Sequence, residues 1–199
     1  MNLALAQIEV EPAKRDRNVE RALEAIGAAA AEGADCVALP EIFDVGYFAF
    51  DAYGRNAEPI GGGTHRAIRA AAVEHDVAVL AGTVVEDLAA SAAAGESVPE
   101  PEGLANTAVL FDADGDRRLV YRKHHLFGYE SAEARLLEPG QALPTATVGG
   151  FTVGIATCYD LRFPEQFRAL TDDGADLFCV PSAWPYPRVE HWRTLGRAR

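Results

Sequence analysis

The alternation of short apolar runs with segments of helical spacing is the strongest constraint on the fold of this chain. Residues 3–10, 36–39 and 77–85 are apolar and short, as buried strands are. The segments between them, about residues 17–31 and 64–75, carry apolar side chains three and four positions apart, which indicates helices. A strand–helix–strand–helix–strand order is typical of α/β proteins, in which helices pack against a sheet.

Turn and capping residues set several of the expected boundaries. Thr64 is expected to cap the second helix, and Pro164 to open a later one, because proline is tolerated in a first helical turn. Asp114-Gly115, between the expected strands of residues 104–112 and 117–122, predicts a β-hairpin. The two further apolar runs expected as strands are residues 151–157 and 176–180.

The whole chain, residues 1–199, is expected to form one domain. Residues 88–103 are small, acidic and proline-bearing, and they predict a surface excursion within that domain rather than a linker between two domains. The final segment, HWRTLGRAR, has the pattern of a helix that begins but lacks a terminal glycine or proline. We therefore expect the chain to be a fragment, truncated at its C-terminus.

Charge and composition exclude several classes of function. The chain has 30 acidic and 18 basic side chains, and phosphate binding needs a basic face, so no nucleic-acid partner is expected. No apolar run approaches the roughly 20 residues that span a bilayer, and the N-terminus lacks the basic segment of a signal peptide. A cytoplasmic protein without membrane contact is therefore expected. Three cysteines without a C-x-x-C pair predict neither a disulfide framework nor a zinc site.

Three residues of different chemistry share one position, directly after an apolar strand. Glu41 follows CVALP, Lys123 follows RRLVYR and Cys158 follows FTVGIAT. The ends of strands are where α/β folds place reactive groups, because the sheet is rigid and its loops converge there. The pattern predicts that these residues form one site.

Cys158 lies at an expected turn between a strand and a helix. Such a turn exposes the side chain near a helix N-terminus, which would lower the pKa of the thiol and supply N–H groups for an oxyanion. The alternative is a buried cysteine, as expected for Cys36 and Cys179, which lie inside apolar runs.

Glu41 and Lys123 also allow two interpretations each. Glu41 lies between apolar residues, a setting that disfavours its charged form and suits a general acid or base, but it could also be a capping or surface glutamate. Lys123 precedes His124 and His125, so it could belong to a solvated basic cluster. The two histidines also admit a cysteine hydrolase with a Cys–His pair, whereas adjacent loop residues make poor metal ligands, so no metal is expected.

The segments LPEIF, YRKHHLF and ATCYDLRFPE, in this order and spacing, resemble the three catalytic segments of the nitrilase superfamily of carbon–nitrogen hydrolases. LALAQIEV, AGTVVE, NTAVLFDADG, LEPG, PSAWP and HWRTLGRAR also match, so the resemblance covers nearly the whole chain. It implies a four-layer α-β-β-α sandwich that pairs across subunits, as a homodimer or a higher homo-oligomer. It implies no metal and no organic cofactor.

The resemblance also implies roles for the residues of the site. Glu41 would be the general base, Lys123 the oxyanion stabiliser and Cys158 the nucleophile. The family uses a second glutamate in the loop after the lysine, and counting back from LEPG favours Glu133, with Glu130 as the alternate.

The implied reaction is hydrolysis of a small carboxamide through a cysteine thioester, with release of ammonia. The backbone N–H of Tyr159 would help to hold the oxyanion. CYDLRFPE resembles the branch of ω-amidases and deaminated-glutathione amidases. Alternatives are a nitrilase, an N-carbamoyl-amide hydrolase, and a catalytically silent relative that acts as an interaction subunit. Leu161 argues against the N-carbamoyl-amide hydrolase, because those enzymes are expected to have a second arginine at this position.

Four further side chains are candidates for substrate binding. Arg162, four residues after the cysteine, could bind a substrate carboxylate through two parallel hydrogen bonds, or form a structural salt bridge with Asp160 or Glu165. Trp184 is expected to line the pocket, and packing in the core is the alternative. The same two readings apply to Tyr47 and Phe48.

Overall fold

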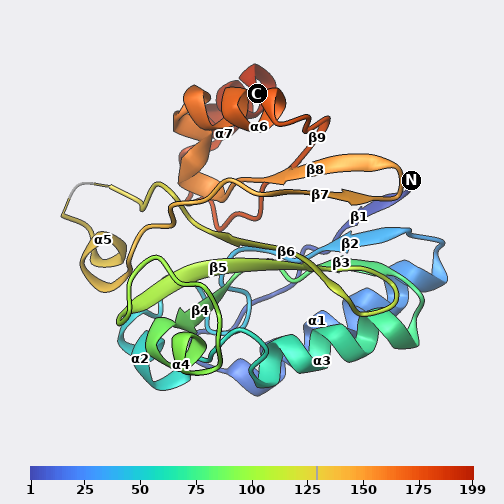
Figure 1. The fold of residues 1–199 in the computed structure, drawn as a ribbon, viewed down its shortest axis with the longest axis horizontal. Coiled ribbons are helices and arrows are strands. Elements are labelled where there is room, and N and C mark those ends of the chain that lie inside the picture. Colours follow the sequence, from blue (N-terminus) through green and yellow to red (C-terminus); the bar gives the residue numbers. More distant parts are fainter. Residues whose placement is uncertain (129) are drawn as a thin grey trace.

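The apolar runs form strands of two separate β-sheets in the computed structural model, which describes residues 1–128 and 130–199 (Figure 1). Within these residues the larger sheet has six strands in the order β1-β2-β3-β5-β4, with β6 paired to β5, and the smaller sheet has the order β7-β8-β9. The strands are β1 Leu3–Leu5, β2 Cys36–Ala38, β3 Ala78–Leu80, β4 Val84–Asp87, β5 Leu104–Phe111, β6 Arg117–Arg122, β7 Thr145–Val148, β8 Phe151–Ile155 and β9 Leu177–Cys179.

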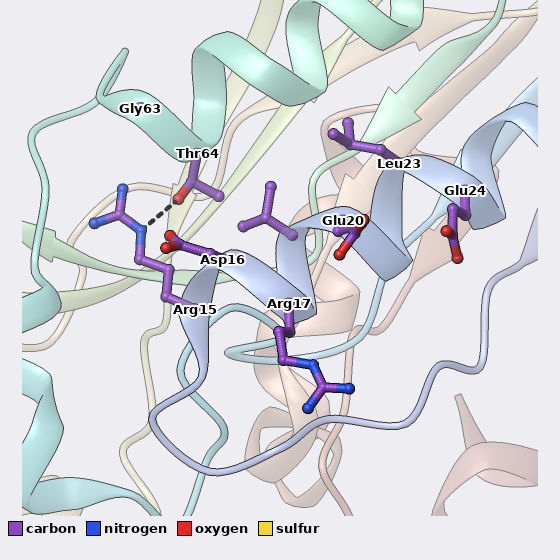
Figure 2. Close-up of a pocket in the computed structure, with 9 residues that line it drawn as sticks. Arg15, Asp16, Arg17, Glu20, Leu23, Glu24, Gly63 and Thr64 are labelled. Atoms are coloured by element: carbon purple, nitrogen blue, oxygen red, sulfur yellow. Dashed lines mark hydrogen bonds between the residues drawn. The ribbon is translucent and has the colours of Figure 1, made fainter.

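Helices cover the outer faces of both sheets (Figure 1). The larger sheet carries α1 and α3, and the smaller sheet carries α6 and α7. A hollow of about 740 Å³ lies beside α1 and the start of α3 (Figure 2). The helices are α1 Arg15–Ala31, α2 Tyr53–Asn56, α3 Gly63–Glu74, α4 Leu88–Ala93, α5 Ala132–Leu136, α6 Pro164–Asp172 and α7 Val189–Ala198, with 3₁₀ turns η1 Phe50–Ala52 and η2 Cys158–Arg162.

Alternating side chains of β5 build two apolar cores. Val109 and Phe111 point to the helices and pack in the cluster that includes Ile26 of α1. Ala108 and Leu110 point the other way and pack between the sheets, in the cluster that includes Ile155 of β8. Buried contacts on both faces of the larger sheet confirm the four-layer α-β-β-α arrangement.

The single strand predicted over residues 77–85 is two strands, β3 and β4. Gly82 breaks it with a φ of +46°, and a Cβ at Gly82 would lie 2.1 Å from the carbonyl oxygen of Pro40. This close approach allows Thr83 to donate its N–H to the Pro40 carbonyl at 3.2 Å. Its Oγ1 accepts the N–H of Ile42 at 2.8 Å. The break therefore fixes the loop that carries Glu41.

Other boundaries differ in detail. Thr64 is not the N-cap of α3. Gly62 takes that position, while Thr64 donates its N–H to Glu58 Oε2 at 2.9 Å from the first turn. Residues 88–103 contain the helix α4, whose first turn Asp87 caps by accepting the Ala90 N–H at 2.9 Å. The predictions of α1, of the β5–β6 hairpin and of α6 with proline in its first turn are confirmed.

Gly82→Ala is expected to destabilise the fold strongly. The new Cβ must push against the Pro40 carbonyl, in addition to the strain of a positive φ, so we expect a loss of about 3 kcal/mol or more in the free energy of unfolding. Gly95→Ala is the matched control, because Gly95 also has a positive φ but has open space around it. It should lose only about 1–2 kcal/mol. Urea denaturation measures both, and equal losses would contradict the close-approach argument.

Candidate active site

The sheet topology brings two of the predicted site residues to one edge. β2 runs parallel to β3, and β5 is antiparallel to both β3 and β6, so β2 and β6 run in the same direction. Glu41 follows the C-terminal end of β2 and Lys123 that of β6, so both residues lie at the same end of the strands of the larger sheet. Cys158 follows β8 of the smaller sheet, which packs face to face with the larger one. The predicted strand-end residues therefore converge from both sheets.

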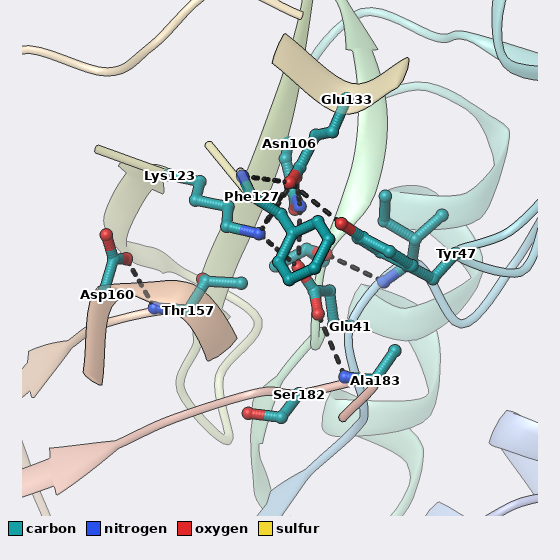
Figure 3. Close-up of polar contacts among 12 residues, drawn as sticks. Glu41, Tyr47, Asn106, Lys123, Phe127, Glu133, Thr157, Asp160, Ser182 and Ala183 are labelled. Atoms are coloured by element: carbon teal, nitrogen blue, oxygen red, sulfur yellow. Dashed lines mark hydrogen bonds and ion pairs between the residues drawn. The ribbon is translucent and has the colours of Figure 1, made fainter. Parts of the chain in front are cut away.

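Lys123 lies between two carboxylates (Figure 3). Its Nζ donates to Glu41 Oε1 at 2.8 Å and to Glu133 Oε1 and Oε2 at 2.9 and 3.1 Å. Lys123 and Glu133 are fully buried and Glu41 is 2% exposed. Burial lowers the pKa of the Lys123 ammonium, but the negative charges of Glu41 and Glu133 raise it by more, so the net shift is upward. Lys123 is therefore a stable buried cation.

Neutral donors complete the coordination of both carboxylates. Asn106 Nδ2 donates to Oε1 of Glu41 at 3.0 Å and of Glu133 at 3.2 Å, and the backbone N–H of Ala183 donates to Glu41 Oε2 at 2.9 Å. Glu133 also receives the hydroxyl of Tyr47 at 3.0 Å and the backbone N–H of Phe127 at 2.6 Å. Asn106 was not among the predicted residues; its signal is a polar side chain inside a strand of alternating apolar residues.

The structure places Glu133, and not Glu130, beside Lys123. Ser131 caps α5 by accepting the N–H of Ala134 at 3.1 Å, and this turn directs the Glu133 side chain inward. Glu130 lies before the helix with a φ of +54° and is exposed.

Cys158 lies in a strained turn, with a φ of +46°, and its backbone N–H donates to the Pro181 carbonyl at 3.0 Å. Burial above all and the nearby Glu41 carboxylate raise the pKa of the thiol, and the charge of Lys123 offsets only part of the rise. The expectation of a lowered pKa is wrong for this resting arrangement. The 3₁₀ turn after Cys158 is too short to counter burial, so the sulfur is a neutral thiol.

Asp160 ties the cysteine turn to the loop after Lys123. Its carboxylate accepts the Tyr121 hydroxyl at 2.5 Å and the Thr157 N–H at 2.7 Å. It also accepts the backbone N–H of His125 at 2.9 Å and lies 2.8 Å from the Nδ1 of that ring, which stacks on Phe163. In the part of the chain that the structure describes, neither imidazole of the histidine pair hydrogen-bonds Cys158, which disfavours a Cys–His hydrolase.

Of the residues expected to contact the substrate, Tyr159, Arg162 and Trp184 lie together. The Arg162 guanidinium lies 5.4 Å from the ring centre of Tyr159 and 5.8 Å from that of Trp184. It also contacts His191 Nδ1 at 3.2 Å. Among the described residues no carboxylate pairs with Arg162, so the alternative of a salt bridge to Asp160 or Glu165 is wrong.

A cavity of about 320 Å³ reaches Glu41. Tyr47, Phe48 and Ala183 line it, and Phe48 is largely exposed at its wall. The hollow beside α1 contains none of the buried ionisable residues (Figure 2). Within residues 1–128 and 130–199, no cluster of His, Cys, Asp and Glu is suited to hold a metal ion. No helix formed by these residues has the length and apolarity that crossing a membrane requires.

Lys123→Met is expected to leave two carboxylates buried side by side without a counter-charge, at a cost of about 3–5 kcal/mol in unfolding free energy. The folded variant should then bind a proton more readily than the unfolded chain, so its stability should rise as the pH falls. Glu133→Gln in the same chain should recover part of the loss. Lys14→Met, at an exposed lysine, is the control and should change little. Urea denaturation at pH 5 and pH 8 checks this, and a variant as stable as the wild type contradicts it.

Comparison with known proteins places this geometry in a family. The model of the carbon–nitrogen hydrolase family matches residues 2–199. The chain is 37% identical to 2-oxoglutaramate amidase of Paenarthrobacter nicotinovorans, over 83% of this chain and 55% of that protein. It is 32% identical to omega-amidase NIT2 of Homo sapiens, over 99% of this chain and 69% of that protein. The chain therefore spans only part of the length of these relatives.

A solved amidase from Nesterenkonia sp. superposes with a TM-score of 0.84 at 26% identity, over 100% of this chain and 70% of that one. That amidase is a member of the nitrilase superfamily, and acrylamide has added to its active-site cysteine in one structure. The family match, the relatives and the shared four-layer fold agree. This chain belongs to the carbon–nitrogen hydrolase family, within the nitrilase superfamily.

Proposed function

We propose that the protein hydrolyses the C–N bond of a small carboxamide, with Cys158 as the nucleophile. The observation that carries the proposal is an ion pair beside a thiol: Glu41 is paired with Lys123 at 2.8 Å, and the charges of both act on the thiol of Cys158. A thiol, a base and a cation in one buried site are the components of acyl transfer. The amidase names of the relatives support the same class of reaction.

The resting protonation states define the first step. The pKa of Cys158 is raised by burial and by Glu41, so the sulfur attacks the carbonyl carbon as its proton passes to Glu41. The negative charge moves to the substrate oxygen, which the Lys123 ammonium and the Tyr159 N–H would hold. That N–H lies in the first turn of η2, where backbone donors have no helical partner.

Three proton transfers complete the cycle. Glu41 gives its proton to the leaving nitrogen, ammonia departs, and a thioester to Cys158 remains. Glu41 then takes a proton from water as the water attacks the thioester, and it passes this proton to the departing sulfur, so that the carboxylic acid is released and the thiol and the Glu41 carboxylate are restored. Glu133 keeps its charge throughout and anchors Lys123 from the side opposite Glu41.

The proposed substrate class is an ω-amide, a short chain with a carboxylate at its other end. Arg162 supports this, because its guanidinium rests on Tyr159 and Trp184 without a carboxylate partner among the described residues. Two relatives are named for activity on such compounds. An N-carbamoyl-amide hydrolase is less well supported, since Leu161 is buried where a second arginine is expected. Assembly into a homodimer or a larger homo-oligomer stays a prediction.

Cys158→Ala is expected to abolish ammonia release from short ω-amides, with a loss of at least about 10³-fold, because the thioester cannot form. Intact-mass analysis during turnover should find an acyl adduct on the wild type and none on Cys158→Ala. Cys179→Ala, at a cysteine in the inter-sheet core, is the control and should retain the adduct. A correctly folded wild type that gives neither ammonia nor adduct would support the silent-subunit alternative.

Arg162→Met should separate recognition from chemistry. Removing a charged donor to the substrate carboxylate is expected to raise KM for succinamate by about 10- to 100-fold. Turnover of butyramide, which has no carboxylate, should change by less than about 3-fold. Arg168→Met, at an exposed arginine of α6, is the matched control. Equal losses on both amides would show that Arg162 supports the structure of the site and does not recognise a carboxylate.

A further inference from the structure

Asn106 touches each component that holds the ammonium in place. Its Nδ2 donates to Glu41 at 3.0 Å and to Glu133 at 3.2 Å, and its backbone carbonyl accepts the backbone N–H of Lys123 at 2.8 Å. We propose that Asn106 is a positioning residue that keeps Glu41 oriented toward Cys158 while Lys123 turns to the oxyanion. This inference rests on the proposed function.

The position of Asn106 on β5 buries its side chain away from solvent. Alternation along the strand puts Asn106 on the same face as Ala108 and Leu110, between the two sheets, where it is fully buried. Neither solvent nor another strand can satisfy its amide there. Its two N–H groups therefore serve the carboxylates alone.

The charges explain why an amide is suited to this point. Glu41 and Glu133 are both hydrogen-bonded through Oε1 to the same Nζ, which brings two like-charged oxygens close together. Asn106 adds two N–H donors from one neutral nitrogen, so it can bond both oxygens without adding charge. An aspartate would offer no donor there and would add a third negative group. A serine would offer one donor.

The two carboxylates depend on Asn106 to different degrees. Besides Lys123 and Asn106, Glu133 has donors in Tyr47 and Phe127, whereas Glu41 has, among the described residues, only the backbone N–H of Ala183. In the proposed reaction Lys123 must redirect a donor to the oxyanion. Asn106 and Ala183 are then the donors that keep Glu41 in place.

The other end of the Asn106 amide supports a requirement for its NH₂ group. Its Oδ1 is buried and has no hydrogen-bond partner among residues 1–128 and 130–199. Buried polar groups are normally paired, and an unpaired acceptor is unfavourable. A residue selected only for packing would be apolar at this place. The unpaired Oδ1 is therefore consistent with a requirement for the two N–H donors that the same amide supplies to Glu41 and Glu133.

Asn106→Leu tests this inference, because leucine has a similar size and no donor. We expect kcat to fall by about 10- to 100-fold with KM within about 3-fold of the wild type. The acid limb of the pH profile should move up by about one pH unit, since the carboxylate form of Glu41 loses a donor. Asn106→Ser keeps one donor, so its kcat and its pH profile should lie between those of the wild type and Asn106→Leu. Thr107→Val is the matched control: it removes one buried hydrogen bond, to Glu86 at 2.6 Å, from the opposite face of β5.

A second readout does not need turnover. Acrylamide alkylates cysteine thiols, and intact mass measures the rate at Cys158 across a range of pH. The pH profile of this rate should shift to higher pH in Asn106→Leu and should match that of the wild type in Thr107→Val. Unshifted profiles in Asn106→Leu, with stability lowered as in Thr107→Val, would overturn the inference and leave a packing role. A wild type that releases no ammonia, together with a shifted alkylation profile, would refute the proposed function and support the positioning role.

Discussion

The rest of the site depends on one buried ammonium that has two anionic partners. Lys123 has no exposed surface, and the three hydrogen bonds that its Nζ makes to the described residues all go to carboxylate oxygens. Desolvating such a group is unfavourable by several kcal/mol unless its partners are held in good geometry. The partners come from distant parts of the chain, Glu41 from the loop after β2 and Glu133 from the short helix α5, so only the folded structure provides that geometry.

The space between the sheets changes from apolar to polar along its length. On β6, Leu119 and Tyr121 belong to the inter-sheet core, and Lys123 continues the same face one step beyond the strand. On β5, Ala108 is followed on that face by Asn106 in the same way. The site is therefore the polar end of a core layer, which is why it is both rigid and shielded from water. Shielding strengthens each electrostatic contact within it.

The strand-end residues could be predicted from the sequence because each is a polar group directly after an apolar run. Asn106 could not be predicted, because it lies inside an apolar run and its role becomes evident only when β5 and β6 are paired in the folded structure. Spacing favoured Glu133 over Glu130, but the choice depends on the turn that Ser131 caps. The pKa of Cys158 was predicted in the wrong direction, because the sequence does not reveal that the turn is buried beside a carboxylate.

The charge of the site gives a physical reason for this particular set of groups. With a neutral thiol, two carboxylates and one ammonium, the resting site carries one net negative charge. In the proposed first step the thiol proton neutralises Glu41, and an equal negative charge appears on the substrate oxygen. The ammonium loses one anionic partner and gains another close by, while Glu133 holds it in place. The total charge of a buried region then stays constant, so the barrier does not include the desolvation of a new charge.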